Sequence, residues 1–278
     1  MKINYSCVVD KQEKFKKQGW LWLNSLIRLG GISPADIWVH CVSGMDAQYI
    51  KKCGGAGVNV EVIEPFGDKK YCNKIAQMSN AKLRGGDFIV LMDTDMIMLE
   101  SFGHLLAGLD CISAKTVDLE NPPAAILDAL FGLAGLEKTL PDNLTGYKAA
   151  RTYGANFNGG LYIIPAAFYG VIEQGWQKWA LWLLENGKPL YDVGLEAHID
   201  QVSFCMAVHE SRLGIKYLNP GYNYPLPYDY GFAGKIYVLH YHYQVSEDFS
   251  SLLLDFEPGE NIRKAVDAAN KFIANLNQ

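Results

Sequence analysis

The first 92 residues alternate between short apolar runs and longer amphipathic stretches. Apolar runs at residues 3–9, 37–42, 58–63 and 88–92 have the length of buried strands. Because these runs are continuous and do not alternate with polar residues, they are typical of parallel strands covered on both faces. Repeated strand–helix units of this length predict a doubly wound α/β fold with right-handed crossovers.

Helical periodicity fills the segments between these runs. It predicts helices over residues 11–29, 46–53 and 71–83. Gly30 and Gly31 follow the first helix, as expected for a left-handed C-terminal cap. The order of elements therefore favours a Rossmann-like half over residues 1–120.

The second half of the chain is less regular, but it contains no internal repeat and no obvious linker. We therefore predict a single domain over 1–278, with a second half at 121–245 and a C-terminal helix within 246–278. The expected elements are helices at 122–140, 166–184, 200–209 and 260–276, strands at 160–164, 215–218 and 236–241, and loops at 145–154 and 219–234.

Composition narrows the class of protein. The chain has 278 residues, 49% hydrophobic and 20% charged, so it can bury a sizeable core and is not expected to be disordered. With 25 Lys+Arg against 30 Asp+Glu, its net charge is −5, which argues against a nucleic-acid partner. The longest uncharged run, 152–172, contains Asn156, Asn158 and Pro165, so no membrane span is expected.

The N-terminus and the cysteines bear on location. Asp10 and Lys11 interrupt the first apolar run before it reaches the length of a signal-peptide core. The six cysteines form no CxxC pair and mostly lie in apolar runs, so we expect reduced, buried thiols. Both observations favour a cytoplasmic location.

Two aspartates follow the apolar run at 88–92. Asp93 and Asp95 are two residues apart, and on extended backbone their side chains would point the same way. Ligands of open α/β sheets bind beyond the carboxyl ends of the strands, where such a pair can hold a hard divalent cation. The alternative is a solvated strand end or a cap for the next segment.

Several stretches resemble the nucleotide-sugar glycosyltransferases of the GT-A fold, and glycosyltransferase family 8 in particular. The resemblance covers about residues 1–245, and its motifs occur in the family's order. They are Asn73-Lys74-Ile75, the run 87–95, the stretch 156–164 (similar to F-N-[SG]-G), the pair Asp200-Gln201, the turn Asn219-Pro220-Gly221-Tyr222-Asn223, and His240-Tyr241-His242.

The resemblance implies a fold, an activity and a cofactor. The fold would be a mixed, mainly parallel sheet flanked by helices in a single domain. The activity would be metal-dependent transfer of a hexose-like sugar from a nucleotide-diphosphate donor, UDP-linked by analogy, to a carbohydrate or other hydroxyl acceptor, with retention. Asp93, Asp95 and His240, with His242 as the alternative to His240, would bind Mn²⁺, or else Mg²⁺.

Asp200 and Gln201 are the expected catalytic pair. In a retaining mechanism Asp200 would act as nucleophile or stabilise developing charge, and in an inverting one a carboxylate would deprotonate the acceptor. Asp200 also has the alternative of a helix N-cap.

The resemblance assigns further residues to a donor pocket, and a structural turn is the alternative for the segment at 156–160. Amide side chains hydrogen-bond sugar hydroxyls, and glycine permits close backbone approach, although a simple tight turn would use the same residues. The expected donor-binding residues are Val8, Val9, Asp10, Asn73, Lys74, Asp93, Thr94, Asp95, Asn156, Asn158, Gly159 and Gly160.

One departure from the family keeps two other functions in view. The Gly-Lys-Pro-Trp part of the family's C-terminal motif is missing after His240, and its lysine contacts donor phosphate in the family. A catalytically silent nucleotide-sugar or carbohydrate-binding protein on the same fold is therefore one alternative. A sugar nucleotidyltransferase is the other, but residues 8–12 lack the Gly-rich, Arg-containing phosphate loop that it would need.

Overall fold

The computed structural model describes residues 1–276. The chain forms two compact units, each assembled from separate stretches. Unit I comprises Met1–Lys2, Ile63–Val90 and Leu109–Tyr217. Unit II comprises Ile3–Val62, Leu91–Gly108 and the chain from Leu218 to the end of the described residues.

The main sheet is mixed and mainly parallel, as predicted. Its seven strands hydrogen-bond in the order β10-β6-β9-β4-β1-β2-β3. The pairs β1–β2 and β10–β6 are parallel, whereas β6–β9 is antiparallel. The strands are β1 (Ile3–Val9), β2 (Ile37–Val42), β3 (Asn59–Ile63), β4 (Phe88–Met92), β6 (Ile112–Thr116), β9 (Phe157–Pro165) and β10 (Ile215–Tyr217).

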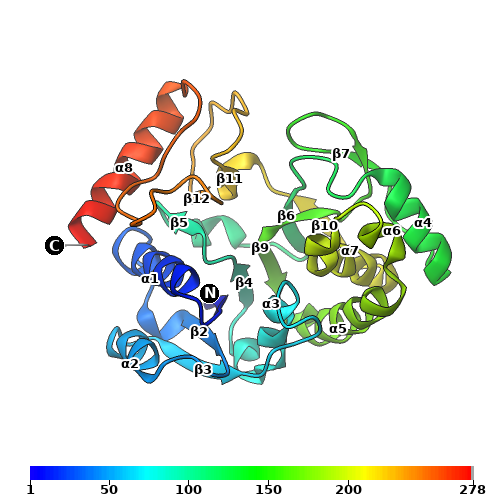
Figure 1. The fold of residues 1–278 in the computed structure, drawn as a ribbon, viewed down its shortest axis with the longest axis horizontal. Helices are drawn as coiled ribbons and strands as arrows, with labels where there is room; N and C mark the ends of the chain where they lie inside the picture. The colour runs from blue at the N-terminus through cyan, green and yellow to red at the C-terminus, as the bar shows by residue number, and fades with distance from the viewer. Residues whose placement is uncertain (277–278) are drawn as a thin grey trace. The chain divides into compact units, whose positions relative to one another are not determined.

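Unit II begins with two strand–helix repeats. Helix α1 (Glu13–Arg28) follows β1, and α2 (Ala47–Gly55) follows β2 (Figure 1). A Cβ atom on Gly19 would lie 2.7 Å from the Cγ2 of Val9, so α1 can approach β1 this closely only with glycine there. The continuous burial of β2 agrees with the parallel pairing that its apolar sequence predicted.

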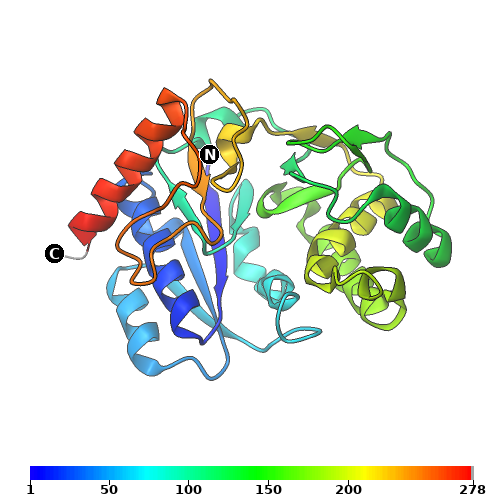
Figure 2. The same cartoon turned by 45° about the horizontal axis from the view of Figure 1, so that its top comes forward.

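Unit II also contains a three-stranded sheet and the C-terminal helix. Strands β11 (Tyr224–Pro225), β12 (Val238–His240) and β5 (Met96–Met98) pair in that order. Helix α8 (Glu260–Leu276) lies alongside the segment that precedes it (Figure 2). Its Ile262, Phe272 and Ile273 join Leu239 and Tyr241 in one apolar cluster, so burial of its apolar face docks the helix.

Unit I is built around two packed helices. Helices α5 (Tyr169–Asn186) and α7 (Ile199–Ser211) lie side by side (Figure 1). Phe204 of α7 stacks on Tyr162 of β9 with ring centroids 4.1 Å apart, and Trp176 of α5 meets Phe204 edge-on. Trp176 and Trp179 are buried, so both side chains belong to the core of unit I.

The remaining elements of unit I are shorter. They are α3 (Asn73–Ala76), α4 (Ala124–Ala134), α6 (Lys188–Tyr191) and the two-stranded pair β7 (Asn143–Leu144) and β8 (Arg151–Thr152). Single 3₁₀ turns across both units occur at Pro34–Asp36, Gln77–Ser79, Ala81–Gly85, Gly103–Leu106, Ala166–Phe168, Glu196–His198 and Pro220–Tyr222.

Some predicted elements were wrong. The helix expected at 71–83 is instead α3 followed by two 3₁₀ turns, because Asn80 has an extended backbone and its side chain accepts from the N–H of Lys82. The helix expected at 122–140 ends at Gly135, which adopts a left-handed conformation. Strands β5 and β6 were not predicted, and neither was the pair β7–β8, because short strands carry little periodic signal.

Two expectations about the whole chain also have outcomes. No helix among the described residues is long and apolar enough to cross a membrane. All six cysteines are free thiols, and all except the partly exposed Cys111 are buried, as predicted.

Candidate functional site

Three side chains of unit II converge into a potential metal centre. One ligand atom each of Asp95, His240 and His242 lie within 4.8 Å of one another. A carboxylate oxygen together with imidazole nitrogens forms a mixed donor set that suits Mn²⁺ and other first-row divalent ions. Both candidate histidines are therefore present together in this cluster.

Strand pairing brings this cluster together. Strand β12 runs antiparallel to β5, and their register places His240 opposite Met96. One step further along, the N–H of Tyr241 donates to the carbonyl oxygen of Asp95 at 3.0 Å. The pairing of β5 with β12 thus fixes a carboxylate and an imidazole that are 145 positions apart in the sequence.

The ring of His240 is held from both sides. Its Nδ1 lies 2.9 Å from Oδ1 of Asn223, and its Nε2 lies 3.2 Å from Oδ1 of Asp95. An amide oxygen only accepts hydrogen bonds, so Nδ1 donates its proton to Asn223, and Nε2 faces Asp95, where either a proton or a metal cation can lie between the nitrogen and the carboxylate. A partner that fixes the tautomer in this way is the usual support of a metal-binding histidine.

His242 completes the cluster from the turn after β12. Its ring stacks on that of His240, with centroids 3.6 Å apart and 26° between the planes. Its φ of 52° lies in the left-handed region, which is costly for a residue other than glycine. Such local strain often accompanies functional positions.

The two histidines of the cluster also lower the pKa of the Asp95 carboxyl group. Burial by itself raises the pKa of Asp95, but the charge and hydrogen bond of His240 and the charge of His242 outweigh it. The pKa of Asp95 is therefore held well below its usual range, and the group is an anion at neutral pH.

Asp93 is not a member of this cluster. The chain turns at Thr94 and Asp95, so the two aspartates do not share the extended backbone assumed from their spacing. Burial chiefly, with smaller contributions from Cys41, Cys53 and Asp93, raises the pKa of the Cys7 thiol on β1. The buried Thr94 donates from Oγ1 to Oε1 of Gln18 at 3.4 Å.

The end of β1 contributes few polar groups. Val9 is fully buried against Gly19 of α1, so its side chain belongs to the core. Val8 is partly exposed, and the carboxylate of Asp10 accepts from the N–H of Lys11 at 2.6 Å. Asp10, directly after β1, therefore supplies the only carboxylate among Val8, Val9 and Asp10.

A second group of predicted residues lies together in unit I. The Nζ of Lys74 donates to the carbonyl oxygen of Gly159 at 2.9 Å and pairs with Oδ2 of Asp200 at 3.3 Å. A Cβ atom on Gly159 would lie only 3.3 Å from this Nζ, so a side chain there would press on the pair. Lys74, Gly159 and Asp200 thus form one contact, although they are far apart in the sequence.

Gln201, Asn156 and Asn73 also belong to unit I. The Nε2 of Gln201 donates to the carbonyl oxygen of Asn121 at 2.6 Å and lies 3.3 Å from Oδ1 of Asn156. The Nδ2 of Asn156 donates to Oγ1 of Thr152 at 2.8 Å, so this buried amide supports the loop before β9. Asn73 is likewise buried, and its Oδ1 accepts from the N–H of Phe66 at 3.1 Å.

Asp200 does not cap a helix. Helix α7 begins at Ile199, with His198 in the N-cap position, so Asp200 lies inside the first turn. There its carboxylate is favoured by the positive end of the helix dipole. The N-cap alternative is therefore wrong, and the carboxylate side chain pairs with Lys74.

A buried ion pair next to these residues was missed from the sequence. Lys115, 3% exposed, pairs with Asp118, and the Nδ2 of Asn158 donates to Oδ2 of Asp118 at 2.6 Å. The Oδ1 of Asn158 accepts in turn from the N–H of Gly160 at 2.9 Å. A lysine within strand β6, followed three residues later by an aspartate, was the available signal.

Asn223 was also missed as a site residue. It is fully buried, and it contacts His240 through the hydrogen bond described above. The sequence placed it at the end of the turn at 219–223, but only the pairing of β11 with β12 brings that turn to the histidine.

Comparison with known proteins identifies the architecture. No family model and no curated protein matches the chain. Among solved structures, the galactosyltransferase LgtC, in complex with donor and acceptor sugar analogs, superposes with a TM-score of 0.54 at 13% identity, covering 96% of this chain and 95% of its own. The chain has the GT-A fold.

Two more structures share this GT-A fold. Mouse xyloside xylosyltransferase 1 matches with a TM-score of 0.51 at 14% identity, covering 87% of this chain and 98% of its own. The glycosyltransferase GlyE of Streptococcus pneumoniae TIGR4 matches with a TM-score of 0.54 at 15% identity, covering 99% of this chain but 63% of its own. The fold predicted from the sequence motifs is confirmed.

Proposed function

We propose that this protein is a metal-dependent glycosyltransferase that uses a nucleotide-diphosphate sugar, with UDP as the nucleotide. The observation that carries the proposal is the Asp95–His240–His242 cluster on a GT-A fold. Solved proteins of similar architecture include galactosyl- and xylosyltransferases, and that likeness supports a transferase.

The residues of the cluster fit a divalent metal ion, and we propose Mn²⁺. Asp95 would supply a carboxylate oxygen and His240 its Nε2, while Asn223 holds the His240 ring. His242 would be a further ligand or would support His240 by stacking. When bound, such an ion would supply Lewis-acid stabilisation of the charge that develops on the leaving diphosphate.

We assign the contacts to the transferred sugar to the residues around Asp200. The carboxylate of Asp200, paired with Lys74, would stabilise positive charge on the sugar during transfer with retention. Lys74 would bind donor phosphate or orient Asp200. Gln201, Asn156, Asn158, Gly159 and Gly160 supply amide and backbone groups suited to sugar hydroxyls.

Metal-dependent donor binding is the direct test. Thermal unfolding is measured with UDP, GDP and several UDP-sugars, each with Mn²⁺ or with EDTA, because a ligand bound only by the native state raises the midpoint. We expect UDP or a UDP-sugar to raise the midpoint with Mn²⁺ and EDTA to remove the effect. No shift with any nucleotide would contradict the proposal.

Release of UDP then separates an enzyme from a silent binding protein. Donors that bind are incubated with water alone and with a panel of saccharide acceptors, and free UDP is measured. A transferase releases UDP faster with one of the acceptors. Metal-dependent binding without release from any donor would instead favour a nucleotide-sugar-binding protein on the same fold.

A further inference from the structure

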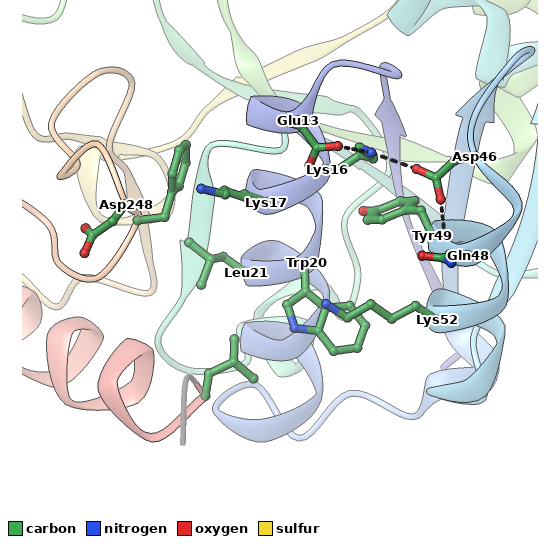
Figure 3. A pocket seen from close by; sticks show the side chains of 12 residues that line it. Glu13, Lys16, Lys17, Trp20, Leu21, Asp46, Gln48, Tyr49, Lys52 and Asp248 are labelled. Atoms are coloured by element: carbon green, nitrogen blue, oxygen red, sulfur yellow. Dashed lines mark hydrogen bonds and ion pairs between the residues drawn. The ribbon is translucent and has the colours of Figure 1, made fainter.

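Unit II contains a cavity whose lining includes none of Asp95, His240 and His242. It has a volume of about 480 Å³, within the range of small-ligand sites, and it opens between α1, α2 and the turn at 246–250 (Figure 3). Its lining combines two lysines, two aromatic rings and two leucines: Lys17, Lys52, Trp20, Phe249, Leu21 and Leu276.

The acidic groups near one edge of the cavity already have partners within the protein. Lys16 forms ion pairs with Glu13 and with Asp46, the latter at 2.7 Å. Asp46 also caps α2 by accepting from the N–H of Tyr49 at 2.7 Å. The two carboxylates share Lys16, so this group keeps a net charge of −1, while its polar atoms bind one another and the end of α2.

Lys17 and Lys52 lack such partners. Neither forms an ion pair with any carboxylate among residues 1–276, and each instead lies over an aromatic ring. The Nζ of Lys52 is 3.9 Å from the ring centroid of Trp20 (Figure 3), and that of Lys17 is 5.4 Å from the ring centroid of Phe249. Two cations without anionic partners thus line an aromatic cavity.

The one remaining carboxylate of the lining is turned into its own loop. Oδ1 of Asp248 accepts from Oγ of Ser246 at 2.7 Å and from the N–H of Ser250 at 3.0 Å. Figure 3 shows the Asp248 side chain pointing away from Lys17. The same hydrogen bonds hold the turn that carries Phe249, and the backbone φ of this residue is 64°.

We propose that this cavity is an accessory binding site for an acidic saccharide, either a sugar phosphate or a sugar acid. The anionic group would pair with Lys17 and Lys52, which have no competing carboxylate. The sugar ring would pack its C–H face on the aromatic and leucine side chains, with its hydroxyls reaching the amide of Gln48. The site is independent of the proposed transfer reaction.

Binding at Trp20 can be followed directly. The six tryptophans are ¹⁵N-labelled, the indole signal of Trp20 is assigned with Trp20→Phe, and EDTA is present throughout to silence any metal site. The probes are glucose 6-phosphate, glucuronate, glucose and inorganic phosphate. We expect glucose 6-phosphate or glucuronate to shift the Trp20 signal saturably, and the stronger of the two distinguishes a phosphate from a carboxylate site.

Two matched double variants test the lysines. Lys17→Met with Lys52→Met should weaken binding about tenfold or more, since a charge-assisted contact contributes this much. Lys14→Met with Lys51→Met removes the same charge from exposed positions on the same two helices outside the cavity, and it should change affinity less than about twofold.

Four results would overturn the proposal. The first is the absence of a saturable Trp20 shift with either acidic sugar. The second is an equal loss of affinity in the two double variants, which would indicate non-specific charge attraction. The third and fourth are binding of glucose, or of inorganic phosphate, as tightly as the acidic sugars.

Discussion

The Nε2 of His240 lies 3.2 Å from Oδ1 of Asp95, across the pairing of β5 with β12. This contact joins a carboxylate from the end of the first Rossmann-like half to an imidazole near the C-terminal end of the fold. An anionic oxygen and an imidazole nitrogen at this separation can share one divalent cation.

Removing the carboxylate of Asp95 should remove the metal. We expect Asp95→Ala to abolish the Mn²⁺-dependent rise in thermal midpoint with UDP and to leave the midpoint of the free protein nearly unchanged, because this partly exposed side chain packs little. Asp267→Asn, an exposed aspartate on α8, is the control. Metal-dependent UDP binding of wild-type strength in Asp95→Ala would refute the assignment.

The contribution of Asp93 is measured in the same assay. Because Asp93 lies outside the cluster, we expect Asp93→Asn to weaken metal-dependent UDP binding less than Asp95→Asn does. Equal loss in the two variants would show that both carboxylates hold the metal when the donor is bound.

Asn223 should act through the orientation of His240. Asn223→Leu removes the acceptor of the Nδ1–H, and loss of such a supporting contact lowers metal affinity about 10–100-fold. Asn223→Asp keeps an acceptor oxygen at the same place and should retain most of the affinity. Titration with Mn²⁺ gives the affinities, and ¹⁵N shifts of the imidazole report the tautomer. Equal affinities in the two variants would exclude the orienting role.

Asp200 is expected to affect transfer more than donor binding. Asp200→Asn removes the charge opposite Lys74 but keeps the shape, so we predict a loss of kcat of about 100-fold or more with little change in donor affinity. Asp192→Asn, at a surface ion pair with Lys188, is the matched control. Unchanged kcat in Asp200→Asn would remove Asp200 from the mechanism.

The buried pair Lys115–Asp118 should be strongly coupled. Lys115→Met leaves the carboxylate of Asp118 buried without its cation, which costs about 3–5 kcal/mol of unfolding free energy. Lys115→Met combined with Asp118→Leu should cost much less than the two single changes added together. Urea unfolding of the four proteins gives the coupling, and additive losses would show that the pair does not interact.

His40 should make stability depend on pH. Burial lowers the pKa of this ring to about 4, opposed by its hydrogen bond to the backbone of Cys7 and by Glu61. Because the folded pKa lies below the unfolded value, the contribution is complete above pH 6.5 and is lost as the pH falls toward 4. Between pH 7.5 and 5.5 the loss should be about 1.3 kcal/mol.

His40→Gln isolates this effect. The variant should show a pH dependence of unfolding free energy that is flatter by about this amount over the same range, whatever its stability at pH 7.5. A pH dependence identical to that of wild type would show that His40 titrates normally.

The sequence by itself determined the alternation of strands and helices in the first half and the nature of the candidate chemistry. Continuous apolar runs favour strands that are buried on both faces. The ends of β1, β2 and β4 were therefore predicted to within a residue. Asp95 and His240 were proposed as ligands because Asp95 comes after the apolar run at 88–92 and His240 lies in the apolar run at 236–241, in the order of the family's motifs. These are local properties of the chain.

The tertiary structure decided which of these residues meet. The antiparallel pairing of β5 with β12 brings Asp95 to His240, and the pairing of β11 with β12 brings Asn223 to the same ring. No local pattern in the sequence marks these pairings. The same holds for Lys74, Gly159 and Asp200, and for the ion pair of Lys115 with Asp118 and Asn158. Contacts between distant segments depend on register and packing, which period and composition do not encode.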